Sequence, residues 1–155
     1  MKAHGTEGRG VCLLPLRSED RFMKRVPFRE GLFTIPSLPS EKAHLIGSRC
    51  RNCQEVMFPQ RSICINCYGD ELEQLALSSR GKLFTFTITH QGPNGFPSPY
   101  ACGYIDLPEG VRIFSLPTDW SPDNLRIGAE GELVIEKMKE DLEGNEVMTY
   151  KFRPV

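Results

Sequence analysis

Four cysteines form the pattern in this sequence that most clearly predicts chemistry. Cys50 and Cys53 are separated by two residues, as are Cys64 and Cys67, and ten residues lie between the two pairs. A two-residue gap lets both thiolates of a pair turn toward one ion, and two such pairs complete a tetrahedral site. Four thiolates leave no open coordination position, which predicts one structural zinc ion per chain rather than a catalytic one. Iron is the chemical competitor, because the same sulfur tetrahedron accepts it.

The remaining cysteines and histidines do not extend this site. Cys102 lies in a predicted strand and is interpreted as a small core residue. As a nucleophile it would need a histidine base, and only His90 falls in the same predicted domain. His44 precedes Cys50 by six residues, but four cysteines already fill the shell. The chain also lacks a phosphate-binding glycine loop and a nucleophile elbow, so we expect no catalytic residues and no activity of its own.

Composition and charge narrow the class of protein. The sequence holds 19 basic and 20 acidic residues, and the net charge of −1 gives no field for binding a polyanion. No segment approaches the ~20 apolar residues needed to span a bilayer, and none resembles a signal-peptide core. We therefore expect a cytoplasmic protein without a membrane partner. In that reducing compartment, paired cysteines hold metal more often than they form disulfides.

The first 44 residues are predicted to form an N-terminal arm. Ser18 can cap a short helix that carries an apolar stripe as far as Val26, and Pro27 must end that helix or follow it. Three prolines within 27–40 predict an extended segment. Two alternatives remain for the apolar side chains of this segment: they fold onto the core of the chain itself, or they lie across a partner.

Apolar and polar residues alternate through most of the second half, which predicts a mostly β fold. Turn signals at Pro108-Glu109-Gly110 and Glu143-Gly144-Asn145 separate neighbouring strands. Five strands with short turns and one longer connection, 117–130, are typical of a small closed barrel. We therefore predict a zinc ribbon over 45–75 and a five-stranded OB-fold barrel over 76–155. The predicted strands are 82–89, about 100–107, 111–116, 131–138 and 147–153.

Zinc ribbons and OB-fold barrels both commonly bind nucleic acid, so this function is an alternative. Binding of single strands needs a basic groove with aromatic side chains on which bases stack. Here the barrel segment is acidic, and its aromatic residues follow the strand periodicity expected of a core. The residues so interpreted are Phe84, Phe86, Tyr150 and Phe152. We therefore expect no nucleic-acid partner.

Several motifs resemble one particular family. They are Ile46-Gly47-Ser48-Arg49-Cys50-Arg51-Asn52-Cys53, Phe58-Pro59-Gln60-Arg61, Cys64-Ile65-Asn66-Cys67, Ser79-Arg80-Gly81-Lys82-Leu83-Phe84-Thr85-Phe86-Thr87, Arg126-Ile127-Gly128 and Phe152-Arg153-Pro154. That family, long labelled a domain of unknown function, joins a rubredoxin-like zinc ribbon to an OB-fold. Its members accompany thiolases, lipid-transfer-type aldolases and acyl-CoA hydratases. The resemblance covers 45–155 and implies a non-catalytic accessory subunit of an acyl-CoA enzyme.

Within this family, the stretch Val26–Thr34 and the closing motifs Glu143–Val147 and Phe152–Val155 resemble the small subunits of benzoylsuccinyl-CoA thiolases. The resemblance implies a thiolase-like catalytic partner in an α2β2 hetero-oligomer. The complex would cleave its coenzyme A thioester substrate to benzoyl-CoA and succinyl-CoA in anaerobic toluene degradation. A partner from an aldolase, hydratase or HMG-CoA synthase-type complex is the alternative. The basic leader 1–25 departs from the family pattern.

The resemblance also suggests which residues meet the partner or its acyl-CoA tunnel. The candidates come from the arm and from the loop 91–100: Phe28, Leu32, Phe33, Phe96, Pro97 and Tyr100. Ordinary hairpin packing is the alternative for the loop. Arg49, Arg51 and Arg61 are candidates for contact with coenzyme A phosphates. Their alternative role is to offset the negative charge of the thiolates.

Overall fold

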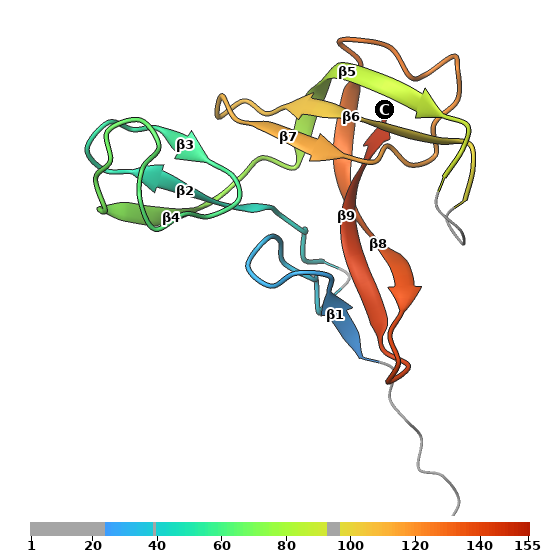
Figure 1. Ribbon diagram of the computed structural model, residues 1–155, viewed down its shortest axis with the longest axis horizontal. Coiled ribbons are helices and arrows are strands. Elements are labelled where there is room, and N and C mark those ends of the chain that lie inside the picture. The colour runs from blue at the N-terminus through green and yellow to red at the C-terminus, as the bar shows by residue number, and fades with distance from the viewer. Residues whose placement is uncertain (1–23, 39, 93–96) are drawn as a thin grey trace, which may run out of the picture.

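The chain forms two β-sheets. The computed structural model describes residues 24–38, 40–92 and 97–155, and within these ranges it contains strands and no helix. A three-stranded sheet, in the order β3-β2-β4, builds a small lobe that projects from a larger sheet in the order β1-β9-β8-β5-β6-β7 (Figure 1). The strands are β1 (Arg25–Pro27), β2 (Ile46–Cys50), β3 (Val56–Met57), β4 (Leu72–Ala76), β5 (Arg80–Thr89), β6 (Tyr100–Asp106), β7 (Arg112–Ser115), β8 (Glu130–Glu140) and β9 (Glu146–Pro154).

Strands β5 to β9 are the five that the alternation predicts, and they confirm a barrel of the OB type. Each neighbouring pair is antiparallel, from β7 through β6, β5 and β8 to β9. The barrel closes where the connection after β7 runs parallel to β9: the Thr118 N–H donates to the Phe152 carbonyl at 2.9 Å. The Tyr150 hydroxyl adds a bond of 3.2 Å to the Phe114 carbonyl. Closure satisfies backbone groups that an open edge would expose.

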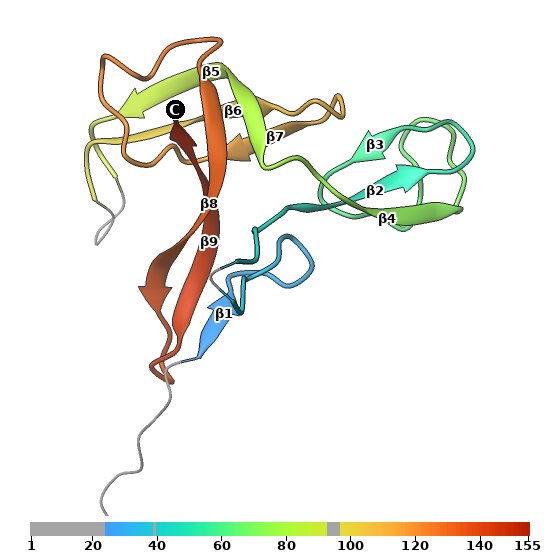
Figure 2. The ribbon, with the colours of Figure 1, turned by 180° about the vertical axis from the view of Figure 1, so that it is seen from behind.

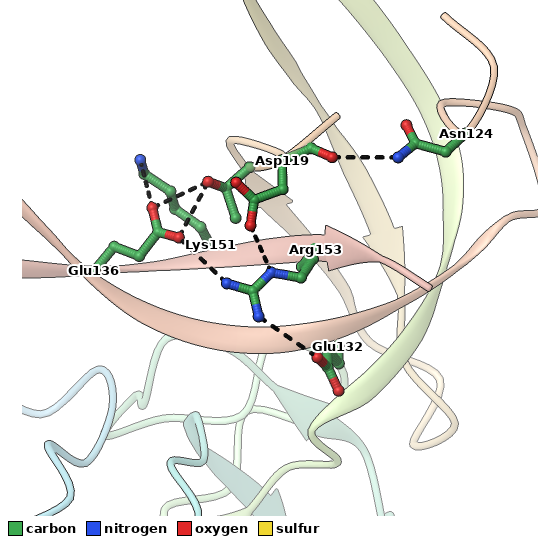
Figure 3. Close-up of polar contacts among 7 residues, drawn as sticks. Asp119, Asn124, Glu132, Glu136, Lys151 and Arg153 are labelled. Carbon is green, nitrogen blue, oxygen red and sulfur yellow. Dashed lines mark hydrogen bonds and ion pairs between the residues drawn. The ribbon is translucent and has the colours of Figure 1, made fainter. Parts of the chain in front are cut away.

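A polar network holds the long connection against the outside of β8 and β9 (Figure 3). The Arg153 Nε lies 2.8 Å from an Asp119 carboxylate oxygen, and the same guanidinium reaches Glu132 and Glu136 at 3.8 and 3.9 Å. The Thr118 hydroxyl donates to Glu136 at 3.1 Å. Exposed pairs such as these contribute less than about 1 kcal/mol each, so the network serves to place the connection rather than to stabilise the fold greatly.

The start of the chain corrects one expectation. The predicted helix from Ser18 lies largely outside the described residues, but Arg25–Pro27 form strand β1, so no helix reaches Val26. This strand pairs parallel with β9 in the register Val26↔Val147, and the Glu146 N–H donates to the Lys24 carbonyl at 2.9 Å. Proline is tolerated on such an edge strand, because its missing N–H is not needed on the free side. A sheet edge therefore overrides the weak local helix signal.

The segment after β1 folds onto the chain's own core. Leu32 and Phe33 are each only 5% exposed, and the Ile46 N–H donates to the Leu32 carbonyl at 2.8 Å. Phe33 also pairs with Leu45 in an isolated bridge. Of the two alternatives for the arm, the structure shows Leu32 and Phe33 folded onto the core of the chain itself. The core that they join is shared with Leu77 at the end of the ribbon and with the barrel's inward residues: Leu83, Ala101, Ile105, Leu107, Val111, Ile113, Leu125, Met148 and Phe152.

A β-bulge in β5 corrects the prediction that Phe84 belongs to the core. The pairing with β6 shifts between Leu83 and Thr85, so Leu83 points inward and Phe84 is exposed. Gly103 on β6 allows this irregularity, because a Cβ there would collide with the Thr85 carbonyl oxygen. Alternation of apolar and polar residues in the sequence cannot reveal a bulge. The extra residue in the strand moves every residue after it to the opposite face of the sheet. Beyond the bulge, Phe86 and Ile88 pack against the core as predicted.

A candidate metal centre and its surroundings

Two similar turns present the four cysteines. In the first, the Cys50 N–H donates to the Glu55 carbonyl at 2.9 Å and the Gln54 N–H donates back to the Cys50 carbonyl at 2.9 Å. In the second turn, the residues fourteen positions later form the same two bonds. The Cys64 N–H donates to the Gly69 carbonyl at 2.8 Å, and the Tyr68 N–H donates to the Cys64 carbonyl at 3.1 Å. We call these turns the first knuckle (50–55) and the second knuckle (64–69). Each places its fifth residue in the left-handed region, with φ values of 64° and 60°.

The four sulfur atoms converge on one point. All four Sγ atoms lie within 4.8 Å of one another, and the Cys50–Cys67 and Cys53–Cys64 pairs are 3.5 Å apart. A tetrahedral zinc site with Zn–S distances of about 2.3 Å separates its sulfurs by about 3.8 Å, so this arrangement suits the ion closely. Cys50 and Cys64 are fully buried. The donor set and its geometry fit a structural zinc held by Cys50, Cys53, Cys64 and Cys67, with no position left for a substrate.

Hydrogen bonds from the knuckles prepare the sulfurs to carry negative charge. The Gly69 backbone N–H, followed by the Asn52 side chain and then Cys50, lowers the pKa of Cys67 to about 6. The Glu55 N–H acts in the same direction on Cys53, yet burial and the three neighbouring sulfurs together raise its pKa to about 11. The Asn66 N–H also points at the Cys64 sulfur, at 3.4 Å. The Cys67 thiolate therefore forms readily, whereas each further thiolate in the cluster is opposed by the negative charge already present. A bound dication relieves this repulsion, so the cluster is suited to hold one.

The three candidate arginines have different surroundings in the ribbon. Arg51 is exposed, and its Nε lies 3.3 Å from a Glu73 carboxylate oxygen. Arg61 is exposed, and its backbone N–H is directed at the Ser48 hydroxyl at 3.4 Å. Arg49 is half-buried in β2, opposite Glu73 in the register. Arg51 therefore already has an anionic partner within the chain, and contact of the set with coenzyme A phosphates stays a prediction.

The predicted partner-contact residues differ in how far they are exposed. Leu32 and Phe33 are buried in this chain, which removes them from the surface that a partner can reach. Phe28 is 42% exposed and packs on Phe33 and Tyr150, with both ring centroids at 6.2 Å. Pro97 is exposed and Tyr100 is half-buried at the start of β6. Phe96 lies outside the described residues.

The barrel carries an exposed aromatic face that sequence reasoning missed. Phe84, Tyr104 and Phe114 are each about half exposed on neighbouring strands β5, β6 and β7. The Tyr104 and Phe114 rings meet edge to face at 5.6 Å, and the Arg112 guanidinium lies over the Phe84 ring at 3.2 Å. Arg112 is also held by Asp106, in two bonds of 2.6 and 3.0 Å. Alternation along β6 and β7 places Tyr104 and Phe114 outward, but Phe84 joins them only because of the bulge.

A closed four-cysteine site in a ribbon ahead of an OB barrel defines this chain as a zinc-ribbon–OB-fold protein. Family models agree with that class over both halves. Residues 43–73 match the ChsH2 rubredoxin-like zinc ribbon domain, and residues 75–136 match the ChsH2 C-terminal OB-fold domain.

Comparison with individual proteins gives the family. The chain is 39% identical to the benzoylsuccinyl-CoA thiolase subunit BbsA of Thauera aromatica, over 83% of this chain and 88% of that protein. It is 40% identical to a DUF35 domain-containing scaffold protein of Methanocaldococcus jannaschii, over 74% of this chain and 84% of the relative. The fold resembles the solved Ltp2-ChsH2(DUF35) aldolase structure, with a TM-score of 0.59, 24% identity and coverage of 72% and 84% of the two chains. The chain belongs to the DUF35 family, as its motifs indicate.

Among the residues that the structure describes, no helix is long and apolar enough to cross a membrane.

Proposed function

We propose that this protein is a non-catalytic, zinc-stabilised accessory subunit of an acyl-CoA enzyme, and that its partner is a thiolase-like catalytic chain. The similarity to BbsA, which extends over most of both chains, carries this proposal. The partner would supply the nucleophile, and the reaction would be thiolysis of benzoylsuccinyl-CoA to benzoyl-CoA and succinyl-CoA. In this role the zinc ion cross-links the ribbon and supplies no Lewis-acid chemistry, because its four ligands would be protein thiolates.

The surface of the barrel favours a protein partner over nucleic acid. Its aromatic face is charge-balanced, since the Arg112 guanidinium is already paired with Asp106. A single-stranded nucleic acid needs free cations along its backbone path as well as stacking rings. Tyrosine, phenylalanine and arginine with few uncompensated charges are instead the composition of a protein interface. The aromatic face therefore supports a protein that works in a complex.

Reconstitution with a catalytic chain tests the proposal. The chain is expressed with its native neighbours, the co-purifying protein is identified, and thiolysis of benzoylsuccinyl-CoA is followed with each component alone and together. We expect a thiolase-like protein to co-purify, this chain alone to be inactive, and the catalytic chain to lose at least tenfold activity without it. Full activity of the catalytic chain purified alone would remove the accessory role. If the complex is active on a different thioester instead, the accessory role stands and the proposed substrate is wrong.

A further inference from the structure

The two zinc knuckles have the same backbone conformation but carry different side chains on their surfaces. Their hydrogen bonds and left-handed fifth residues match position by position, fourteen residues apart. Three side-chain positions lie next to the cysteines: the residue just before each knuckle, counted with it from here on, and two residues within it. In the first knuckle these are Arg49, Arg51 and Gln54. At the same three positions the second knuckle carries Ile63, Ile65 and Tyr68. Because backbone and metal geometry are equivalent, the zinc site itself does not require this difference.

The apolar side chains of the second knuckle point into solvent. Ile63 is 54% exposed, Ile65 is 56% exposed and Tyr68 is 81% exposed. The small core beneath the zinc ligands is made of other residues, namely Met57 and Leu72 with the cysteines. Two of the first knuckle's polar side chains, by contrast, have partners within the chain: Arg51 pairs with Glu73, and the Gln54 amide donates to the Arg51 carbonyl at 3.0 Å. Three exposed large apolar residues on one turn mark a surface that something else covers.

The second knuckle is suited to act as an anchor. Zinc ligation at Cys64 and Cys67 fixes the turn, so little conformational freedom is lost when its side chains are buried. The ribbon projects from the barrel in both views, which leaves the lobe accessible (Figures 1 and 2). A rigid, projecting, apolar tip binds best in a concave apolar pocket, where a few buried side chains contribute most of the affinity.

The features of this chain argue against a second copy as the occupant. Two surface grooves, of about 490 and 360 Å³, are lined by charged as well as apolar residues, so neither is a purely apolar socket. The first includes Arg80, Lys82, Asp106 and Glu130, and the second includes Glu41, Lys42 and His44. The apolar hollow beside Leu83, Ile105 and Phe152 has room for only about 10 Å³, too little for a large side chain. Contact between two knuckles alone would bury far less than the ~800 Å² per partner of a stable interface. The second knuckle itself carries no cation, so its surface suits an apolar protein partner better than a nucleic acid or a free phosphate, even though Arg61 lies two residues before Ile63.

We propose that the second zinc knuckle, through Ile63, Ile65 and Tyr68, docks into an apolar pocket on the catalytic chain of the acyl-CoA enzyme. This assignment rests on the proposed accessory function and specifies the surface that performs it. The first knuckle remains in solvent on the same lobe. Zinc then contributes to assembly indirectly, because it holds the anchor in its binding conformation.

A matched pair of substitutions tests the proposal. Tyr68→Gln and Gln54→Ser change the equivalent left-handed position of the two knuckles, and Tyr68→Gln installs the residue that the first knuckle tolerates there. Ile65→Ser removes a second apolar side chain of the second knuckle. Binding of each variant to the co-purifying catalytic chain is measured by surface plasmon resonance. We expect Ile65→Ser and Tyr68→Gln each to weaken the complex at least tenfold, and Gln54→Ser to change the affinity less than twofold. Zinc content of one ion per chain and an unchanged melting temperature establish that the variants are folded.

The outcomes separate this proposal from the accessory function. If the wild-type chain binds the catalytic chain and the second-knuckle variants bind equally well, the anchor assignment is overturned while the accessory function stands. If the wild-type chain binds no acyl-CoA enzyme, the accessory function fails first. Sedimentation of the isolated chain supplies a third arm: a dimer that Ile65→Ser dissociates would show that a second copy, not a catalytic chain, covers the knuckle.

Discussion

At the scale of single residues, the cysteines determine the chemistry. The spacing between them places two thiolates in each knuckle, and backbone N–H groups from Glu55 and Gly69 point at the second sulfur of each pair. This arrangement is local, since each knuckle is completed within six residues. The sequence could therefore predict the metal ligands without knowledge of the remaining fold.

The first prediction concerns one ligand. Cys64→Ser should reduce zinc from about one ion per chain to below about 0.2, because a buried hydroxyl replaces one of four thiolates. Structural zinc contributes ~10 kcal/mol or more to modules of this size, so the ribbon should unfold with the loss of the ion. Mass spectrometry of the metal and circular dichroism measure both effects. Cys102→Ser is the control and should keep its zinc, and a Cys64→Ser protein that retains one ion per chain would refute the ligand assignment.

At the scale of elements, the strands of the barrel follow from alternation, but their irregularities do not. The sequence predicted all five barrel strands and both hairpin turns, because side-chain period and turn residues are local properties. It missed the bulge after Leu83 and the edge strand at Arg25–Pro27. Both the bulge and the edge strand depend on a partner strand that is distant in the sequence, so a local sequence pattern cannot predict them.

The turn that joins β8 to β9 gives the second prediction. The Asn145 side-chain amide donates to the Asp141 carboxylate at 2.9 Å and is the first cause that lowers the pKa of Asp141, followed by the Asn145 backbone N–H at 2.8 Å. Because the folded pKa lies below the ordinary value of about 3.9, this contact stabilises the hairpin above that pH. The stabilisation is lost as the pH falls through the folded pKa.

Asn145→Ala should therefore raise the Asp141 pKa toward its ordinary value, as measured by carboxyl-detected NMR titration. Leu142→Ala is the matched control in the same turn, because its side chain is fully exposed, and it should leave the Asp141 midpoint in place. An identical Asp141 midpoint in wild type and Asn145→Ala would mean that the amide does not determine the shift.

At the scale of the whole molecule, ribbon and barrel share one core. Phe33 of the arm, Leu45 and Leu77 at the two ends of the ribbon and Phe152 of the barrel belong to a single buried cluster. The ring of Phe58, in the ribbon, meets Tyr150 of β9 edge to face at 5.9 Å. The stability of the barrel should consequently depend on the folded ribbon, although family models describe the two domains separately.

The third prediction uses this coupling. Removal of zinc with a chelator should lower the melting midpoint of the barrel by at least about 5 °C, because the unfolded ribbon no longer covers its part of the shared core. Trp120 is the single tryptophan and packs against that core, so its fluorescence reports on the barrel. Phe58→Ala should reduce the effect of the chelator. If the Trp120 midpoint is the same with and without zinc, the domains are independent.

The sequence by itself determined which four cysteines converge, the barrel strands and the family, because these depend on spacing, alternation and motif order along the chain. Only the tertiary structure decided which apolar residues face outward. Leu32 and Phe33 became core and Phe84 became surface, since burial depends on what distant segments cover. The polar first knuckle and apolar second knuckle were also visible as letters in the sequence. Their equivalence became evident only when matching hydrogen bonds showed that the two turns are the same structure with different surfaces.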